Sequence, residues 1–153
     1  MKHILLFLGA LFCISNAFAK EENLLIESGK KKHRFEIEIA DTPTSRMQGL
    51  MFREKLDADK GMLFVFDKVS LQSFWMQNTL IPLDMIFIKS DGTIAKIHPM
   101  AKPKDLTMIS SGRPVKAVLE INGGQAEKLG LKPGDRVIYD VFAKEAVKPL
   151  AHP

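Results

Sequence analysis

The sequence predicts an α+β domain dominated by strands, in which a mostly antiparallel sheet curls into a small barrel or cradle and carries two short helices. Short apolar or alternating segments recur along the chain and are separated by turns rich in Gly, Pro, Asn and Asp. Only two segments have helical spacing and capping residues, and they do not alternate with strands as the helices of a parallel sheet do. We therefore expect one β-rich domain over residues 20–143.

The first 19 residues have the layout of a secretory signal peptide. Lys2 provides the positive start, residues 4–14 are apolar, and Ala-Phe-Ala at 17–19 is a small-x-small cleavage site. The apolar run is shorter than the ~20 residues that a bilayer-spanning helix needs. We expect an exported protein, periplasmic or secreted, that keeps no stable membrane anchor after cleavage. A frayed tail is expected over residues 144–153.

Composition and charge exclude several classes of protein. The only cysteine, Cys13, lies in the predicted signal peptide, so the mature chain has no thiol for a disulfide, a nucleophile or a thiolate metal site. The full chain has a net charge of +4, and its densest basic cluster is KKKHR at 30–34. Because this cluster directly follows Gly29, we expect it at the solvated tip of a hairpin, and we expect no nucleic-acid partner.

The predicted domain begins with that hairpin and a helix. Residues 23–28 and 34–40 flank the Ser28-Gly29 turn, and apolar and acidic residues alternate in the second segment, as in a half-buried strand. Thr42 can then cap a helix whose first turn contains Pro43. The helix is expected to present one apolar face, made of Met47, Leu50 and Met51.

The rest of the chain predicts six more strands and one more helix. The helix lies within residues 122–135, with Asn122 as a possible N-cap and Gly130 at its C-terminal end. Residues 101–114 are expected to form a loop, since they contain two prolines and a glycine. Strands are expected at 61–66, 71–77, 83–89, 93–100, 115–121 and 136–142, the third and fourth of which form a hairpin around Asp91-Gly92.

Several motifs occur in the order typical of one known family. Together they closely resemble the family called domain of unknown function 192 (DUF192), over about residues 33–142. The resemblance implies a compact β-rich domain, often exported in bacteria, without an agreed biochemical activity or established catalytic residues. The motifs are TSRMQGLMFR at 44–53, GMLFVF at 61–66, FWMQNTLIPLDMIFI at 74–88, DGTIAKI at 91–97 and LGLKPGD at 129–135.

A candidate ligand site lies in the stretch SFWMQNTLIPLDMIF at 73–87, where polar residues interrupt an apolar segment. A buried polar group costs stability unless it is paired. Asn78 therefore either bonds main-chain groups in a turn or faces a pocket. Asp84 either pairs with an arginine of the preceding helix region, Arg46 or Arg53, or faces a ligand. Trp75 directly follows Phe74 in a predicted strand, where successive side chains point to opposite faces, so one of these rings points away from the main core.

These five residues (Trp75, Asn78, Asp84, Arg46 and Arg53) predict a shallow site for a small polar ligand or a partner's peptide. The sequence therefore favours a non-enzymatic binding or accessory module, and we expect no cofactor. None of the common catalytic motifs with a reactive Ser, a zinc-binding His pair or a phosphate-binding loop is present.

Two alternatives remain open. His98 and Met100 have a spacing that places both side chains on one side of an extended chain, and imidazole and thioether are ligands suited to Cu(I). A small hydrolase with Asp84 or His98 as its base is the other alternative. A glycosidase version of it needs a second inward carboxylate, from Glu120 or Asp105.

Overall fold

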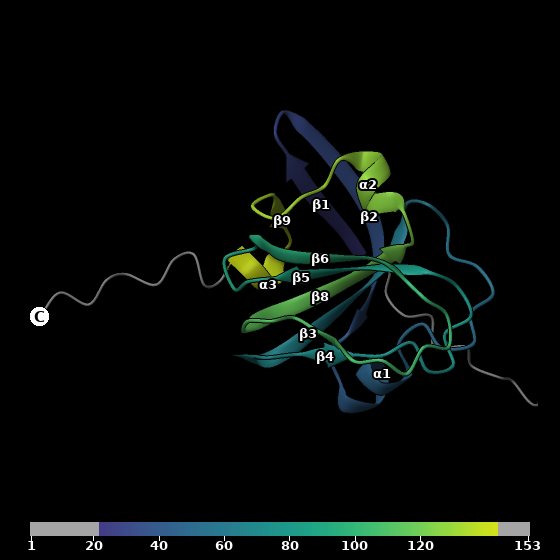
Figure 1. Cartoon of the computed structure of the whole chain (residues 1–153). Helices are drawn as coiled ribbons and strands as arrows, with labels where there is room; N and C mark the ends of the chain where they lie inside the picture. Colours follow the sequence, from purple (N-terminus) through teal and green to yellow (C-terminus); the bar gives the residue numbers. More distant parts are fainter. Residues whose placement is uncertain (1–21, 144–153) are drawn as a thin grey trace, which may run out of the picture.

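One strongly curled sheet of seven strands is the main feature of residues 22–143, the part of the chain that this computed structural model describes (Figure 1). The expected strand-dominated α+β fold is confirmed. The predicted signal peptide with Cys13, and the predicted tail with His152, lie outside the described residues. The strands are β1 (Glu22–Ser28), β2 (Lys31–Ala40), β3 (Lys60–Ser70), β4 (Ser73–Phe74), β5 (Leu83–Ile88), β6 (Ile94–Ala101), β7 (Ile109–Ser110), β8 (Val115–Asn122) and β9 (Arg136–Ile138). The helices are α1 (Pro43–Gln48), α2 (Gln125–Leu129) and α3 (Asp140–Ala143).

The strand order of the large sheet is β6-β5-β8-β3-β2-β1-β9, and β4 pairs with β7 in a separate two-stranded ladder. All neighbours in the large sheet are antiparallel except β2 and β3, which pair in parallel on either side of α1. The mostly antiparallel sheet is therefore as expected, and the β2–α1–β3 crossover is a local exception to it. A parallel pair needs such a connection, because the chain must return to the starting edge of the first strand.

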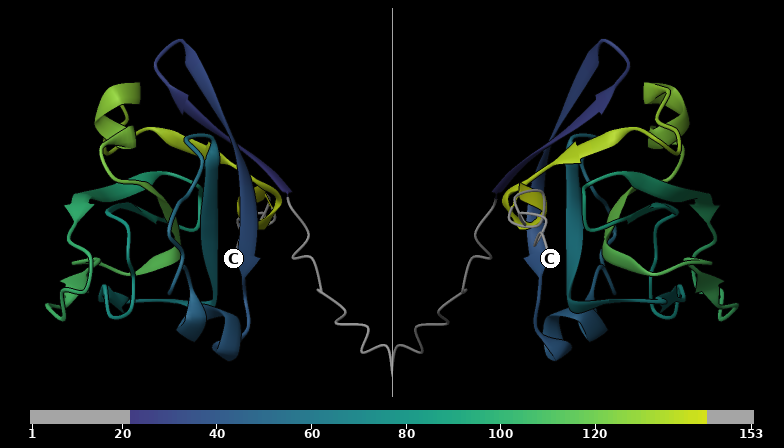
Figure 2. Two further views of the ribbon diagram at one scale, coloured as in Figure 1. Left: turned by 90° about the vertical axis from the view of Figure 1, so that its right-hand side faces the viewer. Right: turned by 90° about the vertical axis from the view of Figure 1, so that its left-hand side faces the viewer.

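Backbone bonds across β9 and the start of β6 close the curl of the sheet. The amide of Ile94 donates to the carbonyl of Asp135 at 2.8 Å, and the amide of Val137 donates to the carbonyl of Gly92 at 2.8 Å. Gly92 has φ +84°, and a Cβ at this position would lie 2.5 Å from the Val137 carbonyl oxygen. Only glycine fits this approach. Because these bonds and the Thr93–Arg136 bridge join the two edges of the sheet, the Asp91-Gly92 turn lies where the barrel-like sheet closes. Figure 2 shows the curl of the sheet from two sides.

Both faces of the central strands are buried, because two apolar clusters lie on opposite sides of the sheet. All six residues of β5 are buried. Along β5, Ile86 and Ile88 face the cluster beneath β1, β9 and α2, whereas Met85 and Phe87 face the cluster that includes Phe64. This alternation follows from the two-residue period of a strand. The second cluster is the one that borders the candidate site.

Three local predictions were wrong in their extent. The first helix has the predicted Thr42 cap, with a reciprocal Thr42–Ser45 capping box, but it ends at Gln48. Met47 is consequently 76 % exposed while Leu50 is buried, so the predicted apolar face does not form. Of the predicted strand at 71–77 only β4 forms, since Met76 turns to donate its amide to the Asp105 carbonyl at 2.9 Å.

The predicted last strand is shortened in the same way, since β9 ends at Ile138 and α3 follows. The predicted 101–114 loop contains the short strand β7, which pairs with β4. Gly124 takes the N-cap position of α2 in place of Asn122, and Gly130 is the left-handed C-terminal residue as predicted. No helix among the described residues is long and apolar enough to cross a membrane.

Candidate functional site

A groove of about 550 Å³ opens between one face of β3 and β8 and the segments that contain α1 and β4. We call it the β3 groove. Its walls are mainly apolar and aromatic, with a few polar side chains, which is the usual composition of a ligand site. The lining residues that give the groove its chemistry are Arg46, Phe64, Phe66, Phe74, Trp75, Asn78 and Glu120.

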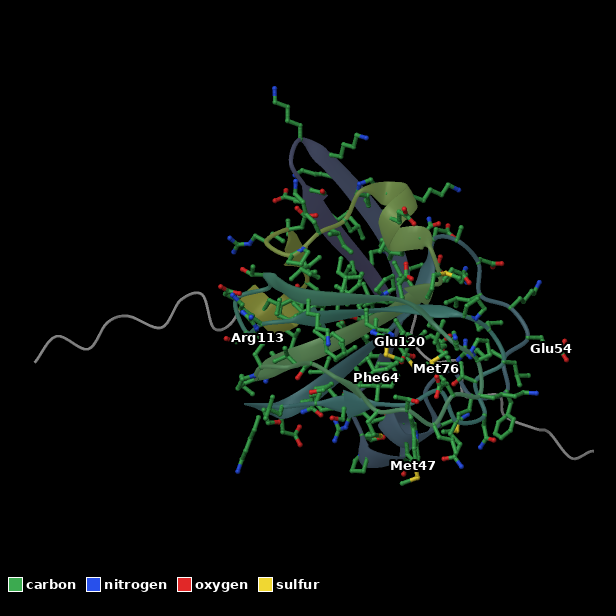
Figure 3. All side chains as sticks on the ribbon, in the orientation of Figure 1. Met47, Glu54, Phe64, Met76, Arg113 and Glu120 are labelled. Atoms are coloured by element: carbon green, nitrogen blue, oxygen red, sulfur yellow. The ribbon has the colours of Figure 1, made fainter. Side chains whose placement is uncertain are left out.

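The floor of the groove contains a buried carboxyl group, that of Glu120. On β8, Glu120 lies opposite Met62 of β3 and Met85 of β5, so its side chain shares their face of the sheet. Glu120 is only 5 % exposed, and none of the hydrogen bonds or ion pairs among the described residues involves its carboxyl group. Figure 3 shows Glu120 in the interior of the domain, whereas Met47 is at its edge.

Burial raises the pKa of Glu120 to about 8, because the charged form loses its hydration and gains no partner. At pH 7 the group is therefore mainly a neutral carboxylic acid. A neutral carboxyl group both donates and accepts a hydrogen bond. The floor of the groove thus offers a ligand one donor and one acceptor in an apolar setting.

Aromatic rings build the wall of the groove above this floor. Phe74 of β4 makes edge-to-face contacts with Phe64 and Phe66 of β3, at ring centroid distances of 5.2 and 6.4 Å. Phe74 packs against the core, whereas Trp75, the next residue, is 47 % exposed at the groove rim. The prediction that one of these two rings faces away from the core is therefore confirmed.

A cation, Arg46 of α1, lies at the other end of the groove. Its Nη1 donates to the main-chain carbonyls of Asp41 at 2.6 Å and Val65 at 2.8 Å, and its Cζ lies 5.6 Å from the ring centroid of Phe66. No acidic side chain of a described residue forms an ion pair with it. On β3, Phe66 is four residues from Met62, the neighbour of Glu120, so about 13 Å of strand separates the residue that contacts Arg46 from the residue next to Glu120.

Of the five residues predicted as a ligand site, Trp75, Asn78 and Arg46 line the β3 groove. Asn78 has φ 58° and its carbonyl accepts the amide of Phe52 at 2.8 Å, so its main chain forms a tight turn at the rim. Neither Asp84 nor Arg53 is part of the groove lining.

Asp84 is instead enclosed on the opposite face of the sheet. It is 0 % exposed and accepts three main-chain amides, those of Met100 and Gly124 at 2.9 Å and Ala126 at 2.8 Å. Two of these amides are at the start of α2, so Asp84 supplies the cap that Gly124 has no side chain to make. The expected ion pair between Asp84 and an arginine is wrong.

Arg53 pairs with Glu38 of β2 instead, through a two-bond arrangement in which Nη2 lies 2.6 Å from Oε2. The hydrogen bond to Glu38 raises the pKa of Arg53 above its ordinary value. The pair ties the segment after α1 to the sheet, which is a structural role of the kind predicted for Asp84.

The candidate metal ligands lie on β6, away from the groove lining. A register shift of the β5–β6 ladder falls between His98 and Ala101, and Met100 has φ 52°. The shift breaks the regular alternation that would put His98 and Met100 on one side of the strand. The described residues contain no group of three or more His, Cys, Asp or Glu side chains able to hold a metal ion.

Asp105, one of the two acids considered as a second carboxylate, does not line the groove, and its carboxylate accepts the amide of Thr107 at 2.8 Å. Glu120, the other acid considered, lines the groove, but Asp84 does not. The sequence signal for Glu120 is the same as for Asp84, a lone acid inside an apolar strand. Sequence reasoning missed its importance because only the fold shows which of the two acids has partners.

Comparisons with known proteins agree on the family and the fold. The model of the DUF192 family, described as "Uncharacterized ACR", matches residues 24–139. A proposed transcription regulator from Sinorhizobium meliloti 1021 has a crystal structure with 42 % identity and a TM-score of 0.77, covering 78 % of this chain and 94 % of that one. A protein of unknown function from Novosphingobium aromaticivorans DSM 12444 has 38 % identity and a TM-score of 0.79, covering 82 % and 89 %. No curated protein matches the chain.

Proposed function

The chain belongs to the DUF192 family, and from that premise we propose that its domain is a non-enzymatic binding or accessory module whose β3 groove holds a small ligand or a partner's peptide. One observation carries the proposal, the Glu120 carboxyl group on the groove floor. The carboxyl group has lost most of its hydration, and no described residue bonds to it, so its position on the groove floor costs free energy. A ligand that supplies the missing hydrogen bonds would offset this cost.

The walls of the groove support binding. Its volume of about 550 Å³ lies within the range of small-molecule and cofactor sites. Phe74 is held by edge-to-face contacts with the buried Phe64 and with Phe66, so the partly buried rings of Phe66 and Phe74 form a surface that needs little reordering when a ligand arrives. Trp75 at the rim adds a large ring that is free to stack on the ligand.

Binding is favoured over the hydrolase alternative because the groove has a single titratable acid. Among its described lining residues, Glu120 is the one Asp, Glu or His side chain. A hydrolase that uses general acid and base groups needs a second group within reach of the first. Asp84, the base considered from the sequence, faces the other side of the sheet and is fully bonded to main-chain amides.

Export is a further part of the proposal, based on residues 1–19 alone. The measurement is the mass of the chain recovered from the periplasm or medium of an expressing bacterium. A chain that begins at Lys20 supports export, and a chain that keeps residues 1–19 in the cytoplasm contradicts it.

Binding can be tested by NMR titration of the ¹⁵N-labelled protein with N-acetyl amino-acid N-methylamides of Phe, Leu and Gln. We expect shifts at the indole of Trp75, the only tryptophan, and at amides around the β3 groove, but none at the β1–β2 turn. Glu120→Leu removes the polar floor and should weaken binding, whereas Glu127→Leu, at an exposed position on α2, should not. The proposal fails if millimolar probe shifts nothing, or if Glu120→Leu binds as well as the unchanged protein.

A further inference from the structure

Arg46 and Glu120 give the two ends of the β3 groove different chemistry. Arg46 has five N–H donors, of which the described main-chain bonds use only those of Nη1. Its Nε and Nη2 can therefore meet a carboxylate with two parallel bonds. The contact with the Phe66 ring and the two carbonyls hold the guanidinium in place before any ligand binds.

The Glu120 end favours a neutral group with both a donor and an acceptor. Glu120 is buried between Met62 and Met85, and no described cation pairs with it. A peptide group presents an N–H and a C=O, and either one can bond to a neutral carboxyl group. A ligand with only a hydrocarbon chain at this end would leave the Glu120 carboxyl group without partners.

The distance between these ends matches a short extended peptide. Phe66, which Arg46 contacts, and Met62, the neighbour of Glu120, are four residues or about 13 Å apart along β3, so an extended peptide that runs along the strand covers this stretch with about four residues. The partly buried rings of Phe66 and Phe74 line the groove next to the Arg46 end and can pack against apolar side chains, while the buried ring of Phe64 supports Phe74 from below. The side-chain amides of Gln48 and Gln77 also line the groove and can bond a peptide main chain.

We propose that the β3 groove binds the C-terminal residues of a partner polypeptide, with the terminal carboxylate on Arg46 and an upstream peptide group on the Glu120 carboxyl. This inference rests on the proposed binding function and names its ligand class. A free fatty acid shares the carboxylate and the apolar chain, but it has no group for Glu120. The charge at one end and the polar floor at the other therefore favour the peptide.

The test compares two probes, the peptide acetyl-Ala-Phe-Leu-Phe with a free C-terminal carboxylate and the same peptide with a C-terminal amide. Trp75 fluorescence reports binding, because neither probe contains tryptophan. We expect the free acid to bind at least about tenfold more tightly, the difference that one charge-assisted bidentate contact provides. Arg46→Gln should remove this difference, and Arg46→Lys, which keeps the charge but not the two-bond geometry, should keep only part of it.

Two further variants separate the roles of the ends. Glu120→Leu should weaken both probes by the same factor and leave their ratio unchanged. Arg113→Gln, at an exposed arginine outside the groove lining, should leave both affinities unchanged. Circular dichroism of each variant distinguishes loss of binding from loss of folding, and Arg46→Lys serves as the charge-preserving variant if Arg46→Gln does not fold.

Several outcomes overturn the inference. If the peptide acid and the peptide amide bind equally well, the assignment of the groove to a C-terminal carboxylate is wrong. The proposed binding function still stands if the N-acetyl amino-acid N-methylamides shift the NMR signals of the groove. Octanoate binding more tightly than the peptide acid, and insensitive to Glu120→Leu, assigns the groove to fatty acids instead. If neither peptide nor the blocked amino acids bind, the proposed function itself fails.

Discussion

Asp84 and Glu120 lie on adjacent strands, one step apart in the β5–β8 register, and their carboxyl groups point to opposite faces of the sheet. Asp84 pairs with Ile121 across the ladder, and Met85 pairs with Glu120. One acid is surrounded by three main-chain amides, and the other has no described partner. Two similar residues in similar apolar strands thus have opposite roles, one in capping a helix and one on the floor of a groove.

The stability of the protein should depend on pH through Glu120. Its pKa is raised from the ordinary 4.5 to about 8 in the folded state, so the folded state binds more protons than the unfolded state between these pH values. The free energy of unfolding should therefore fall as the pH rises through this window, by on the order of a few kcal/mol. The measurement is urea unfolding from pH 4.5 to 8.5.

Glu120→Gln is the matched variant, because glutamine keeps the shape of the side chain and does not titrate. As the pH rises, the free energy of unfolding of the variant should increase relative to that of the unchanged protein. A constant difference across the window would show that the Glu120 carboxyl group is not held neutral by burial.

Replacing Asp84 should damage folding without acting through the groove. In Asp84→Asn the amide NH₂ would face main-chain N–H groups, so at least one donor loses its acceptor. We expect a loss of about 3 kcal/mol in the free energy of unfolding, measured by urea unfolding at pH 7.

Asp91→Asn is the control for this change, because the exposed Asp91 accepts one amide, that of Thr93 at 2.9 Å. Its cost should be about 1 kcal/mol or less, as for an exposed hydrogen bond. Equal losses for the two variants would contradict the importance of the enclosed three-amide site. So would an Asp84→Asn variant that is fully stable.

Closure of the sheet should depend on Gly92. In Gly92→Ala the new Cβ would lie 2.5 Å from the Val137 carbonyl oxygen, in addition to the cost of a left-handed φ. Gly29→Ala is matched to it, since Gly29 also has a positive φ but has no atom within 4 Å of the new Cβ. We expect thermal unfolding to show Gly92→Ala at least about 1–2 kcal/mol less stable than Gly29→Ala. Similar melting temperatures would count against the contact.

Two adjacent aromatic residues should respond differently to alanine. Phe74 contacts three rings, those of Phe64, Phe66 and Phe87, so Phe74→Ala should cost about 3 kcal/mol of unfolding free energy. Trp75 is half exposed at the rim, so Trp75→Ala should cost less than about 1 kcal/mol.

The two variants also differ in what they should do to binding. Trp75→Ala should keep its fold and show weaker groove shifts in the NMR titration with the blocked amino acids. A Trp75→Ala protein that unfolds would show that this ring is a core residue and not part of a ligand surface.

Much of the fold could be predicted from local patterns. The alternation of Phe35, Ile37 and Ile39 with two glutamates predicts β2, and the Thr42-Pro43 pair predicts the start of α1. The element ends were less predictable, because Met76 and Tyr139 leave their strands and bond residues far along the chain, Asp105 and Glu22. Met76 donates to Asp105, and the Tyr139 carbonyl accepts the amide of Phe142 in the turn into α3.

For the candidate site, the sequence identified Trp75, Asn78 and Arg46, because a large ring, an amide and a cation next to an apolar segment have few purely local uses. The sequence could not show which of the two acids, Asp84 or Glu120, lacks hydrogen-bond partners. Both are lone acids in apolar strands, and their environments depend on α2 and β3, segments far away along the chain.

By itself, the sequence determined the fold class, the hairpin, the Thr42 and Gly130 caps and the presence of buried acids, because these depend on residue periodicity and on contacts within a few positions. The tertiary structure alone decided which acid is satisfied. The amides that enclose Asp84 come from residues 16 to 42 positions away, and within residues 22–143 no such donor reaches Glu120 on the other face of the sheet. Hydrogen bonds between residues so far apart depend on how strands and helices pack, and local sequence does not determine that packing.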